Sequence, residues 1–195
     1  GHSILLIRPP GSGKTALARA LPEILPPLTY EEGLDVAANY IAGYGYDRLG
    51  PAIVTERPFR APHYSVSAAG LVGGGRQFRP GEAGLVDGGR EFRPGEVSLA
   101  HHGVLFLDDL LEFKRVAVEA LCEPMDTGSV RLFRRAECTA WLARFQLVAA
   151  INPCPCGYRG SALWVCTCDG DQVVRYFSRF SEFLRRFQIS VEVPH

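Results

Sequence analysis

Residues 8–15, RPPGSGKT, have the residue types of a loop that binds the phosphates of a nucleotide. In such a loop, glycines let backbone N–H groups approach phosphate oxygens closely, and the following helix directs its positive N-terminus at them. Lys14 would reach the β and γ phosphates, and the Thr15 hydroxyl would be a ligand of Mg²⁺. The usual pattern begins with glycine, where this chain has Arg8. The expected nucleotide contacts are Pro10, Gly11, Ser12, Gly13, Lys14 and Thr15.

A second motif, VLFLDD, occupies residues 104–109 and ends in two acids. An apolar strand that ends in an acid is the part that organises Mg²⁺ opposite a phosphate loop. Asp108 would hold Mg²⁺ beside Thr15, and Asp109 is the natural candidate for polarising the attacking water. The alternative for residues 8–15 is a Pro-Gly turn before a helix that happens to contain Gly-Lys-Thr. Both elements, present in the right order, favour a nucleotide site that uses Mg²⁺.

Cysteines form a third chemical group, two C-x-C pairs that nine residues separate. Four thiolates in one short loop are the ligand set of a tetrahedral zinc site. The spacing is tighter than the usual C-x₂-C, and the alternative is a loop of reduced or oxidised thiols. His101 and His102 are expected to be packing or interface residues, because no acid or cysteine shows ligand spacing with them. The candidate zinc ligands are Cys154, Cys156, Cys166 and Cys168.

These groups need a scaffold, and composition indicates one ordinary globular domain. The chain has 195 residues, 47% of them apolar and 22% charged. Its formal net charge is zero, so contact with nucleic acid would require a local basic patch. No apolar run approaches the roughly 20 residues that span a bilayer, and GHSILLI at the start lacks the layout of a secretory signal. We therefore expect no membrane partner, and thiols or metal ligands before disulfides. Because the chain begins without Met directly before an apolar strand, we expect it to be a partial domain.

Apolar runs alternate with helical segments along the chain. Strands are expected at 3–7, 57–62, 104–107, 146–151 and 189–193, and helices after the phosphate loop, at 29–42, at 113–128 and at 173–184. Thr29 and Glu32 predict a capping box at the start of the second helix, and Pro124 and Gly128 are expected to end the third. This alternation predicts a parallel sheet that helices cover on both faces.

One internal repeat interrupts this pattern. AGLVGGGRQFRPGE (69–82) is followed at once by AGLVDGGREFRPGE (83–96). Two copies are too few for a solenoid, and their glycine and charge content suits a projecting insert. The alternative is a harmless duplication in a tolerant loop.

Taken together, the motifs resemble one family. A GPPGSGKT-like loop, RPFRAPHYS, LVGGG, RPGEVSLAHHGVLFLDD and AAINPCPCGY occur in the order seen in the Mg-chelatase-like AAA+ ATPases related to the competence protein ComM, also called YifB. The resemblance covers essentially the whole chain. It implies an α/β AAA+ core with a five-stranded parallel sheet, assembled into a hexameric ring in the bacterial cytoplasm. It also implies a DNA helicase that promotes branch migration in recombination during natural transformation.

The resemblance assigns two further residues. Asn152, at the end of an apolar strand, matches the sensor that orients the hydrolytic water, and its amide can both donate and accept. Arg186 matches the arginine finger that would enter a neighbouring subunit's site. This sequence departs from the family pattern at Asp109, where the family has Glu, and at Arg185, where it has Asp. The family has one copy of the repeated segment, and its helical lid and amino-terminal Lon-like domain are expected to be absent from residues 1–195.

Basic residues suggest how DNA would be held. Arginines of the segment after the DTGS turn and of the insert could face the pore of a ring and contact phosphates. The alternative is a solvated charged face. The arginines concerned are Arg76, Arg79, Arg90, Arg93, Arg131, Arg134 and Arg135. Two other functions stay open: a motor subunit of a metal chelatase, against which the cysteine loop argues, and a nucleotide-dependent scaffold that hydrolyses little.

Overall fold

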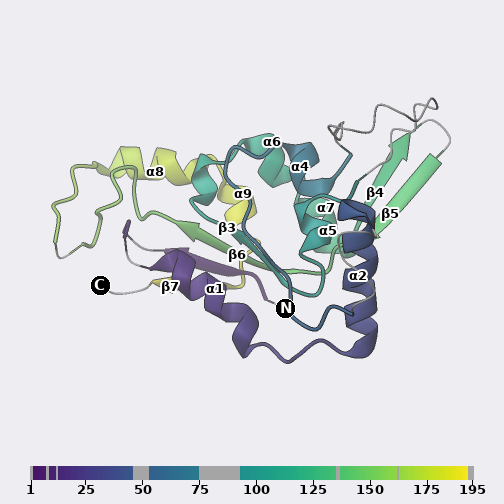
Figure 1. Ribbon diagram of the computed structural model, residues 1–195. Coiled ribbons are helices and arrows are strands. Elements are labelled where there is room, and N and C mark those ends of the chain that lie inside the picture. The colour runs from purple at the N-terminus through teal and green to yellow at the C-terminus, as the bar shows by residue number, and fades with distance from the viewer. Residues whose placement is uncertain are drawn as a thin grey trace, which may run out of the picture.

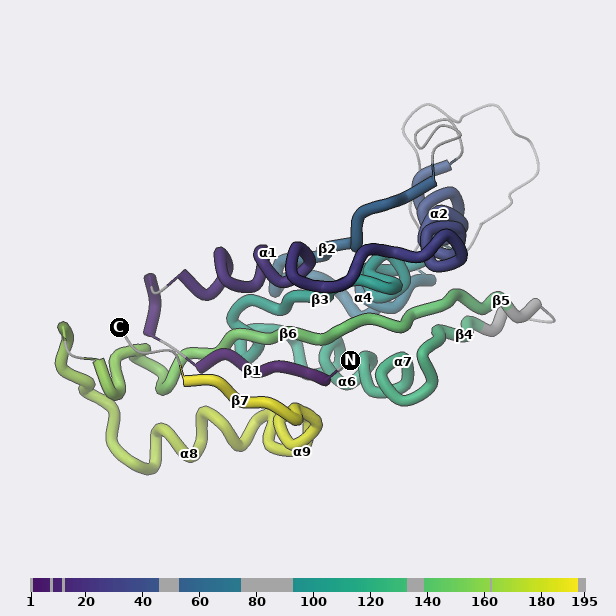
Figure 2. Tube along the Cα trace, turned by 90° about the horizontal axis from the view of Figure 1, so that it is seen from below, coloured from purple at the N-terminus to yellow at the C-terminus, as the bar shows by residue number. Residues whose placement is uncertain are grey.

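A computed structural model describes residues 2–7, 9–11, 13–45, 53–74, 93–134, 137–161 and 163–192, with the backbone alone given for 133–134 and 137–138. Its centre is a sheet of five parallel strands (Figures 1 and 2), as the sequence predicts. In spatial order these are β2 (Phe59–Arg60), β3 (Val104–Leu107), β6 (Gln146–Ile151), β1 (Ile4–Ile7) and β7 (Ile189–Glu192). The three central strands, β3, β6 and β1, are short, largely apolar and largely buried, which is typical of a sheet covered on both faces.

Alternate residues of these strands face two separate cores. Leu105 and Leu107 of β3 belong to the larger core, and Val104 and Phe106 belong to the smaller one with Ala18. Ala18 lies on α1 (Lys14–Ile24), below the strands in Figure 1. Helices above the strands cover the larger core: α4 (Ala68–Val72), α5 (Glu96–Leu99), α6 (Arg115–Glu119), α7 (Cys122–Thr127), α8 (Gly170–Ser178) and α9 (Ser181–Leu184). The predicted helical cover on both faces is therefore confirmed.

Helix α2 (Tyr30–Tyr44) stands at one end of the sheet, beside α5 and the hairpin described below (Figure 1). It begins with the predicted capping box, in which the Thr29 hydroxyl accepts from the backbone N–H of Glu32 and the Glu32 carboxylate accepts from that of Thr29. Buried Asn39 donates to the carbonyls of Ser98 and Leu142. These bonds hold α2 against the rest of the domain.

The prediction of one continuous helix at 113–128 is wrong in detail. The chain instead forms a 3₁₀ turn, η1 (Leu110–Glu112), followed by α6 and α7. Pro124 lies in the first turn of α7, where its missing N–H has no helical partner to lose, so it does not end the helix. Gly128, with φ 67°, does end it. The segment predicted at 173–184 is also divided, into α8 and α9, because Phe180 turns into the larger core between them.

Two further features lie outside the five-stranded sheet. β4 (Ser129–Arg134) and β5 (Glu137–Leu142) form an antiparallel hairpin. The two ends of the repeat segment meet where Gly73 pairs with Pro94, and residues 75–92 of the predicted insert lie outside the described residues. None of the described helices is long and apolar enough to cross a membrane.

Candidate functional site

The residues predicted from the sequence to form a nucleotide site follow three neighbouring strands. The phosphate loop follows β1, Asp108 and Asp109 follow β3, and Asn152 follows β6. Since β3, β6 and β1 are adjacent and parallel, the three segments leave the sheet at the same edge. That edge, at the carboxyl ends of the strands, is where open α/β sheets bind ligands.

Side chains from the three segments meet in two adjacent sets of hydrogen bonds, together called the network here. The Thr15 hydroxyl donates to Oδ2 of Asp108 at 2.7 Å. The Lys14 ammonium donates to Oδ1 of Asn152 at 2.8 Å, and the Asn152 amide donates to Oδ1 of Asp109 at 3.2 Å. Lys14 is 8% exposed, so its charge lies inside the site. The network brings an ammonium, two carboxylates, a hydroxyl and an amide together.

The loop that precedes α1 fits a phosphate group. Gly11 and Gly13 have φ values of 79° and 78°, a conformation that glycine adopts without strain. A Cβ atom at either position would meet nothing within 4 Å, so this side of the loop is open. Gly13 is the N-cap of α1 and has no side chain to occupy the first N–H groups of this eleven-residue helix. Arg8 and Ser12 lie outside the described residues.

Asp109 occupies a special backbone position. Its φ of 52° is left-handed, a region in which Asp is more common than most residues. This turn directs the chain from β3 into η1. Nearby, burial, followed by the carboxylates of Glu112 and Asp109, raises the pKa of Tyr176 to about 12. The Tyr176 hydroxyl therefore stays protonated beside these acids at neutral pH.

Arg186 lies elsewhere in the chain. It follows α9, and its guanidinium donates to Oδ1 of Asp126 at 2.7 Å. The side chain is 36% exposed. The structure does not bring Arg186 to the network of its own chain. A contact with a neighbouring subunit stays a prediction.

The four predicted zinc ligands converge. The Cys154 sulfur lies 3.3 Å from that of Cys156 and 3.7 Å from that of Cys166, and the Cys156 and Cys166 sulfurs are 3.6 Å apart. All four sulfurs, including that of Cys168, lie within 4.8 Å of one another. A tetrahedron of Zn–S bonds of about 2.3 Å has sulfurs about 3.8 Å apart. The cluster therefore has the size of a zinc site, and none of these cysteines forms a disulfide.

Backbone N–H groups also point at the sulfurs of this cluster. The N–H of Cys156 donates to the Cys168 sulfur and that of Arg159 to the Cys154 sulfur, both at 3.4 Å. The N–H groups of Tyr158 and Thr167 lower the pKa of Cys156 to about 6. Hydrogen bonds of this kind commonly orient the residues that bind a metal.

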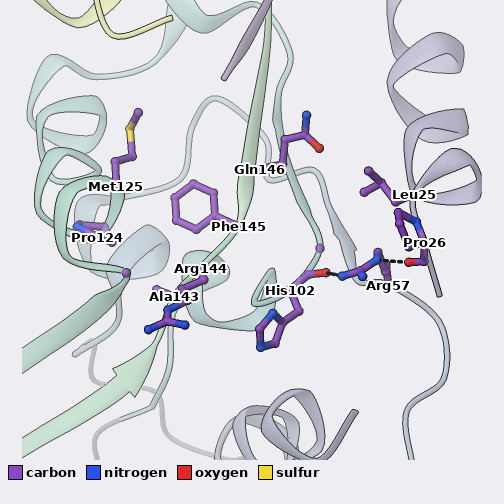
Figure 3. A pocket seen from close by; sticks show the side chains of 12 residues that line it. Leu25, Pro26, Arg57, His102, Pro124, Met125, Ala143, Arg144, Phe145 and Gln146 are labelled. Carbon is purple, nitrogen blue, oxygen red and sulfur yellow. Dashed lines mark hydrogen bonds between the residues drawn. The ribbon is translucent and has the colours of Figure 1, made fainter. Parts of the chain in front are cut away.

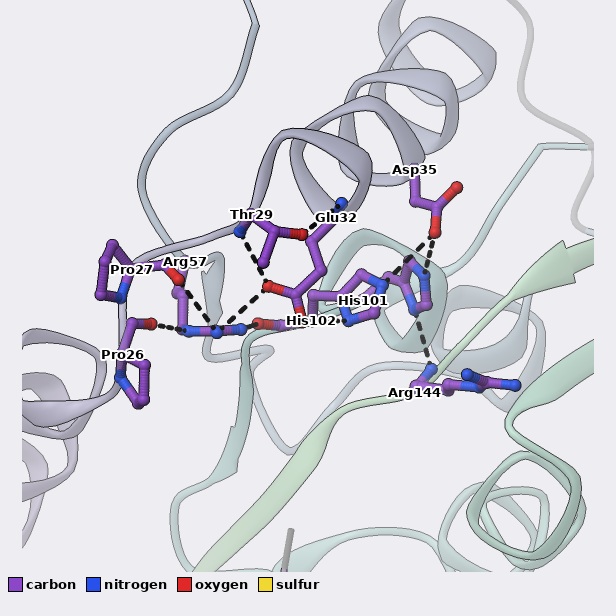
Figure 4. A network of polar contacts seen from close by, with 9 residues as sticks. All are labelled: Pro26, Pro27, Thr29, Glu32, Asp35, Arg57, His101, His102 and Arg144. Atoms are coloured by element: carbon purple, nitrogen blue, oxygen red, sulfur yellow. Dashed lines mark hydrogen bonds and ion pairs between the residues drawn. The ribbon is translucent and has the colours of Figure 1, made fainter.

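The two histidines lie in a separate polar network, where Asp35 and Glu32 of α2 face His101 and His102 (Figure 4). Asp35 and the two rings have potential ligand atoms within 4.8 Å of one another, a proximity that sequence spacing did not reveal. The backbone N–H of Arg144, however, donates to Nδ1 of His101 at 2.9 Å. The neutral ring then carries its proton on Nε2, the atom that faces Asp35 at 3.8 Å, and has no lone pair there for a metal.

The charge state of His101 agrees with a packing role. Burial, then the neighbouring His102, lowers the pKa of His101 to about 4. The ring is therefore neutral at pH 7, and it is fully buried. The predicted packing role of His101 thus agrees with its contacts.

A pocket of about 460 Å³ lies at the opposite edge of the sheet (Figure 3). Its lining includes Gly103 and Phe145, which precede β3 and β6, so it opens at the amino ends of the strands. Arg57 in this pocket is already bonded to the carbonyls of His102 and Pro26. The residues predicted to bind nucleotide, magnesium or zinc are not among the described residues that line this pocket.

Two residues near the site received no role from sequence reasoning. Gly157 lies inside the NPCPCGY motif, which marks it in the sequence, but its contact with Pro10 could not be predicted from that motif. Tyr176 lies within α8 and carries no sequence signal that marks it. Both are close to the predicted residues, Gly157 through Pro10 and Tyr176 through Asp109.

Fold and site together define the class of protein. A five-stranded parallel sheet, a Gly-Lys-Thr loop after β1, acids after β3 and an amide after β6 form the α/β core of a P-loop protein of the AAA+ type. The family model described as magnesium chelatase, subunit ChlI, matches residues 1–85 and 82–195. The chain therefore belongs to the Mg-chelatase-like family. The two matches overlap inside the repeat, as expected of a model with one copy of that segment.

Relatives resemble the chain over its full length. The uncharacterized protein YifB of Salmonella typhimurium is 44% identical over 196 residues, which cover 100% of this chain and 35% of the relative. The competence protein ComM of Haemophilus influenzae is 40% identical over 195 residues, 99% of this chain and 35% of the relative. The chain thus spans about a third of the length of these relatives.

Proposed function

We propose that this chain binds Mg-ATP and hydrolyses it as the core of a ring-forming AAA+ motor that acts on DNA. The observation that carries the proposal is the network of Lys14, Thr15, Asp108 and Asn152, which joins the phosphate loop to two other strand ends. Membership of a family that includes a protein named for competence supports branch migration or helicase action in recombination or natural transformation. The same proposal places the protein in the bacterial cytoplasm.

Mg-ATP would supply the γ-phosphoryl group and a divalent charge near the β and γ phosphates. The backbone of Pro10–Gly13 and the first turn of α1 would hold phosphate oxygens. Lys14 would add its positive charge at the same place, and the oxygens of Thr15 and Asp108, 2.7 Å apart, are the kind that Mg²⁺ prefers. These residues bind and orient the nucleotide.

Asp109 and Asn152 would position the attacking water. The Asn152 amide holds one carboxylate oxygen of Asp109, which leaves the second oxygen to accept a proton from water. The half-buried, protonated Tyr176 lies near this carboxylate. In a hexameric ring, as the family resemblance implies, Arg186 of one subunit would stabilise charge in the site of the next.

Two other contacts belong to the proposal. The cysteine cluster would bind one zinc ion, which the sulfur spacing supports. Exposed Arg131 on β4 and Arg93 at the base of the repeat would contact DNA phosphates in the pore of the ring. Arg76, Arg79, Arg90 and Arg135 lie outside the described residues, as does the side chain of Arg134.

The test is equilibrium binding of Mg-ATP, with phosphate release followed in the same sample, with and without branched DNA. Binding and DNA-stimulated release are expected, and Lys14→Ala should abolish binding because it removes the buried charge. DNA-independent release that a protein partner stimulates would favour a chelatase-type motor instead. No binding by the unaltered chain would refute the proposal.

A second candidate, a nucleotide-dependent scaffold, rests on Asp109. This residue is one methylene shorter than the Glu of the family pattern, and its position already commits one oxygen to Asn152. A scaffold would bind Mg-ATP and assemble but release little phosphate. Asp109→Glu separates the two functions: a rise in turnover indicates a weakened motor, and an unchanged low turnover indicates the scaffold.

A further inference from the structure

We propose that Gly157 and Pro10 couple the four-cysteine loop to the phosphate loop, so that the metal-binding loop positions the residues that bind ATP. This inference rests on the proposed binding of Mg-ATP and zinc. It assigns to Gly157 a positioning role that neither site includes by itself.

The two loops are in close contact at this point. A Cβ atom built on Gly157 would lie 2.8 Å from Cδ and 2.9 Å from Cγ of Pro10. Ordinary carbon contacts are about 3.5–4.0 Å, so only a glycine lets the backbone come this close to the proline ring. Gly157 also has φ 83°, a left-handed conformation that closes a turn with its N–H bonded to the carbonyl of Cys154 at 2.9 Å.

The turn that presses on Pro10 is built from the cysteine cluster. Cys154 and Cys156 lie on the turn itself, and the buried Cys154 sulfur accepts the N–H of Arg159 beyond it. Cys166 closes the cluster from the other limb of the loop, 3.7 Å from the Cys154 sulfur. Holding the four sulfurs together therefore fixes the backbone of Gly157.

Pro10 passes this constraint to the phosphate loop. Its ring fixes its own φ, so the residue transmits a displacement rather than absorbing it. Gly11 follows directly, and Gly13 with its φ of 78° leads into Lys14. The same cysteine segment starts at Asn152, which already contacts Lys14 at 2.8 Å. The cysteine loop thus reaches the nucleotide site along two routes, one covalent and one through packing.

Two glycine substitutions in the full chain test the contact. Gly157→Ala adds a methyl group against Pro10, whereas Gly160→Ala adds one at φ 78° with nothing within 4 Å. The two glycines have similar positive φ values, so both variants bear similar backbone strain, and only the first should disturb the phosphate loop. We expect Gly157→Ala to raise the Kd for Mg-ATP about ten-fold, a change of about 1.4 kcal/mol, and Gly160→Ala to leave it within about two-fold.

A rescue experiment separates positioning from general damage. Pro10→Ala removes the ring atoms that the new methyl group would meet, so the double variant Gly157→Ala/Pro10→Ala should bind Mg-ATP more tightly than Gly157→Ala alone. Zinc content and Tm are measured for each variant. A merely structural role for Gly157 would lower Tm and would not be rescued at Pro10.

The reverse coupling is measured on the unaltered chain and does not depend on a variant that folds. Linkage between two binding sites is reciprocal, so saturating Mg-ATP should raise the affinity for zinc by the same factor by which bound zinc raises the affinity for Mg-ATP. Competition with a chelator measures the affinity for zinc. Zinc affinity that is the same with and without Mg-ATP would overturn the inference.

The outcomes keep the inference distinct from the proposed function. If the unaltered chain binds Mg-ATP and zinc, but Gly157→Ala binds Mg-ATP like Gly160→Ala, the coupling is wrong and the proposed function stands. If the unaltered chain fails to bind Mg-ATP, the proposed function fails and the coupling fails with it.

Discussion

Asn152 offers the sharpest test of the candidate site, because its amide joins two residues with different tasks. It accepts from the buried ammonium of Lys14 at 2.8 Å and donates to the carboxylate of Asp109 at 3.2 Å. Asn152→Ala removes both bonds. Both partners are charged, and a hydrogen bond to a charged group contributes about 1.5–3 kcal/mol. Because the two bonds share one amide and the one to Asp109 is long, we expect their combined contribution to the ordering of the site to be about 2–3 kcal/mol.

That loss should be apparent in turnover more than in binding. A cost of about 2–3 kcal/mol in the transition state lowers turnover roughly 30- to 150-fold. The Kd for Mg-ATP should change less than about three-fold, because Lys14 and the backbone of the phosphate loop remain. Phosphate release at saturating Mg-ATP measures the first quantity, and titration with a fluorescent nucleotide measures the second.

Asn39 provides a matched control for this experiment. Its amide also makes two hydrogen bonds, to the carbonyls of Ser98 and Leu142, but these lie in the packing of α2. Asn39→Ala leaves buried carbonyls without a donor and should lower stability by about 1–3 kcal/mol while turnover stays unchanged below its Tm. Turnover of Asn152→Ala equal to that of the unaltered chain, or an equal loss in Asn39→Ala, would refute the assignment of Asn152.

Other variants test the remaining parts of the molecule. Cys166→Ser should lose zinc, detected by metal analysis and by loss of the thiolate-to-cobalt absorption after Co²⁺ substitution, whereas Cys122→Ser, outside the cluster, should keep both. Gly103→Ala should unfold the domain or lower its Tm sharply, because a Cβ atom there would clash with the backbone carbonyl oxygen of Pro58. Gly170→Ala, with nothing within 4 Å of its Cβ, should leave Tm unchanged or raised. Arg186→Ala should cost less than about 1 kcal/mol of stability, because its ion pair is exposed, yet lower turnover in assembled rings without changing the Kd for Mg-ATP.

Much of the site could be predicted because its residues follow buried parallel strands. Thr15 and Asp108 are 93 positions apart, yet they meet at 2.7 Å. Their apolar strands β1 and β3 both pair with β6, which fixes the edge from which both segments leave the sheet. The pattern of short apolar runs, each followed by polar residues, therefore contained the geometry of the network.

Other contacts could not be predicted, because they depend on packing between segments. The approach of Asp35 to His101 requires the position of α2 relative to β3, which local periodicity does not contain. The division of the helix predicted at 113–128 has a similar origin. Val116, placed on its apolar stripe, is 70% exposed, because α6 is a separate short helix. Spacing predicts which residues share a helix face only where the helix is continuous.

The position of Asp109 bears on whether the site hydrolyses ATP. A short carboxylate that swings freely would hold water poorly, but Oδ1 of Asp109 is fixed by the Asn152 amide at 3.2 Å. Its left-handed backbone, at φ 52°, directs the side chain toward that amide. The fixed orientation of the Asp109 carboxylate therefore offsets part of the reach lost with the missing methylene. We expect Asp109→Glu to raise turnover by a smaller factor than Asn152→Ala lowers it. A rise greater than that loss would mean that side-chain length, rather than the contact with Asn152, limits the positioning of water.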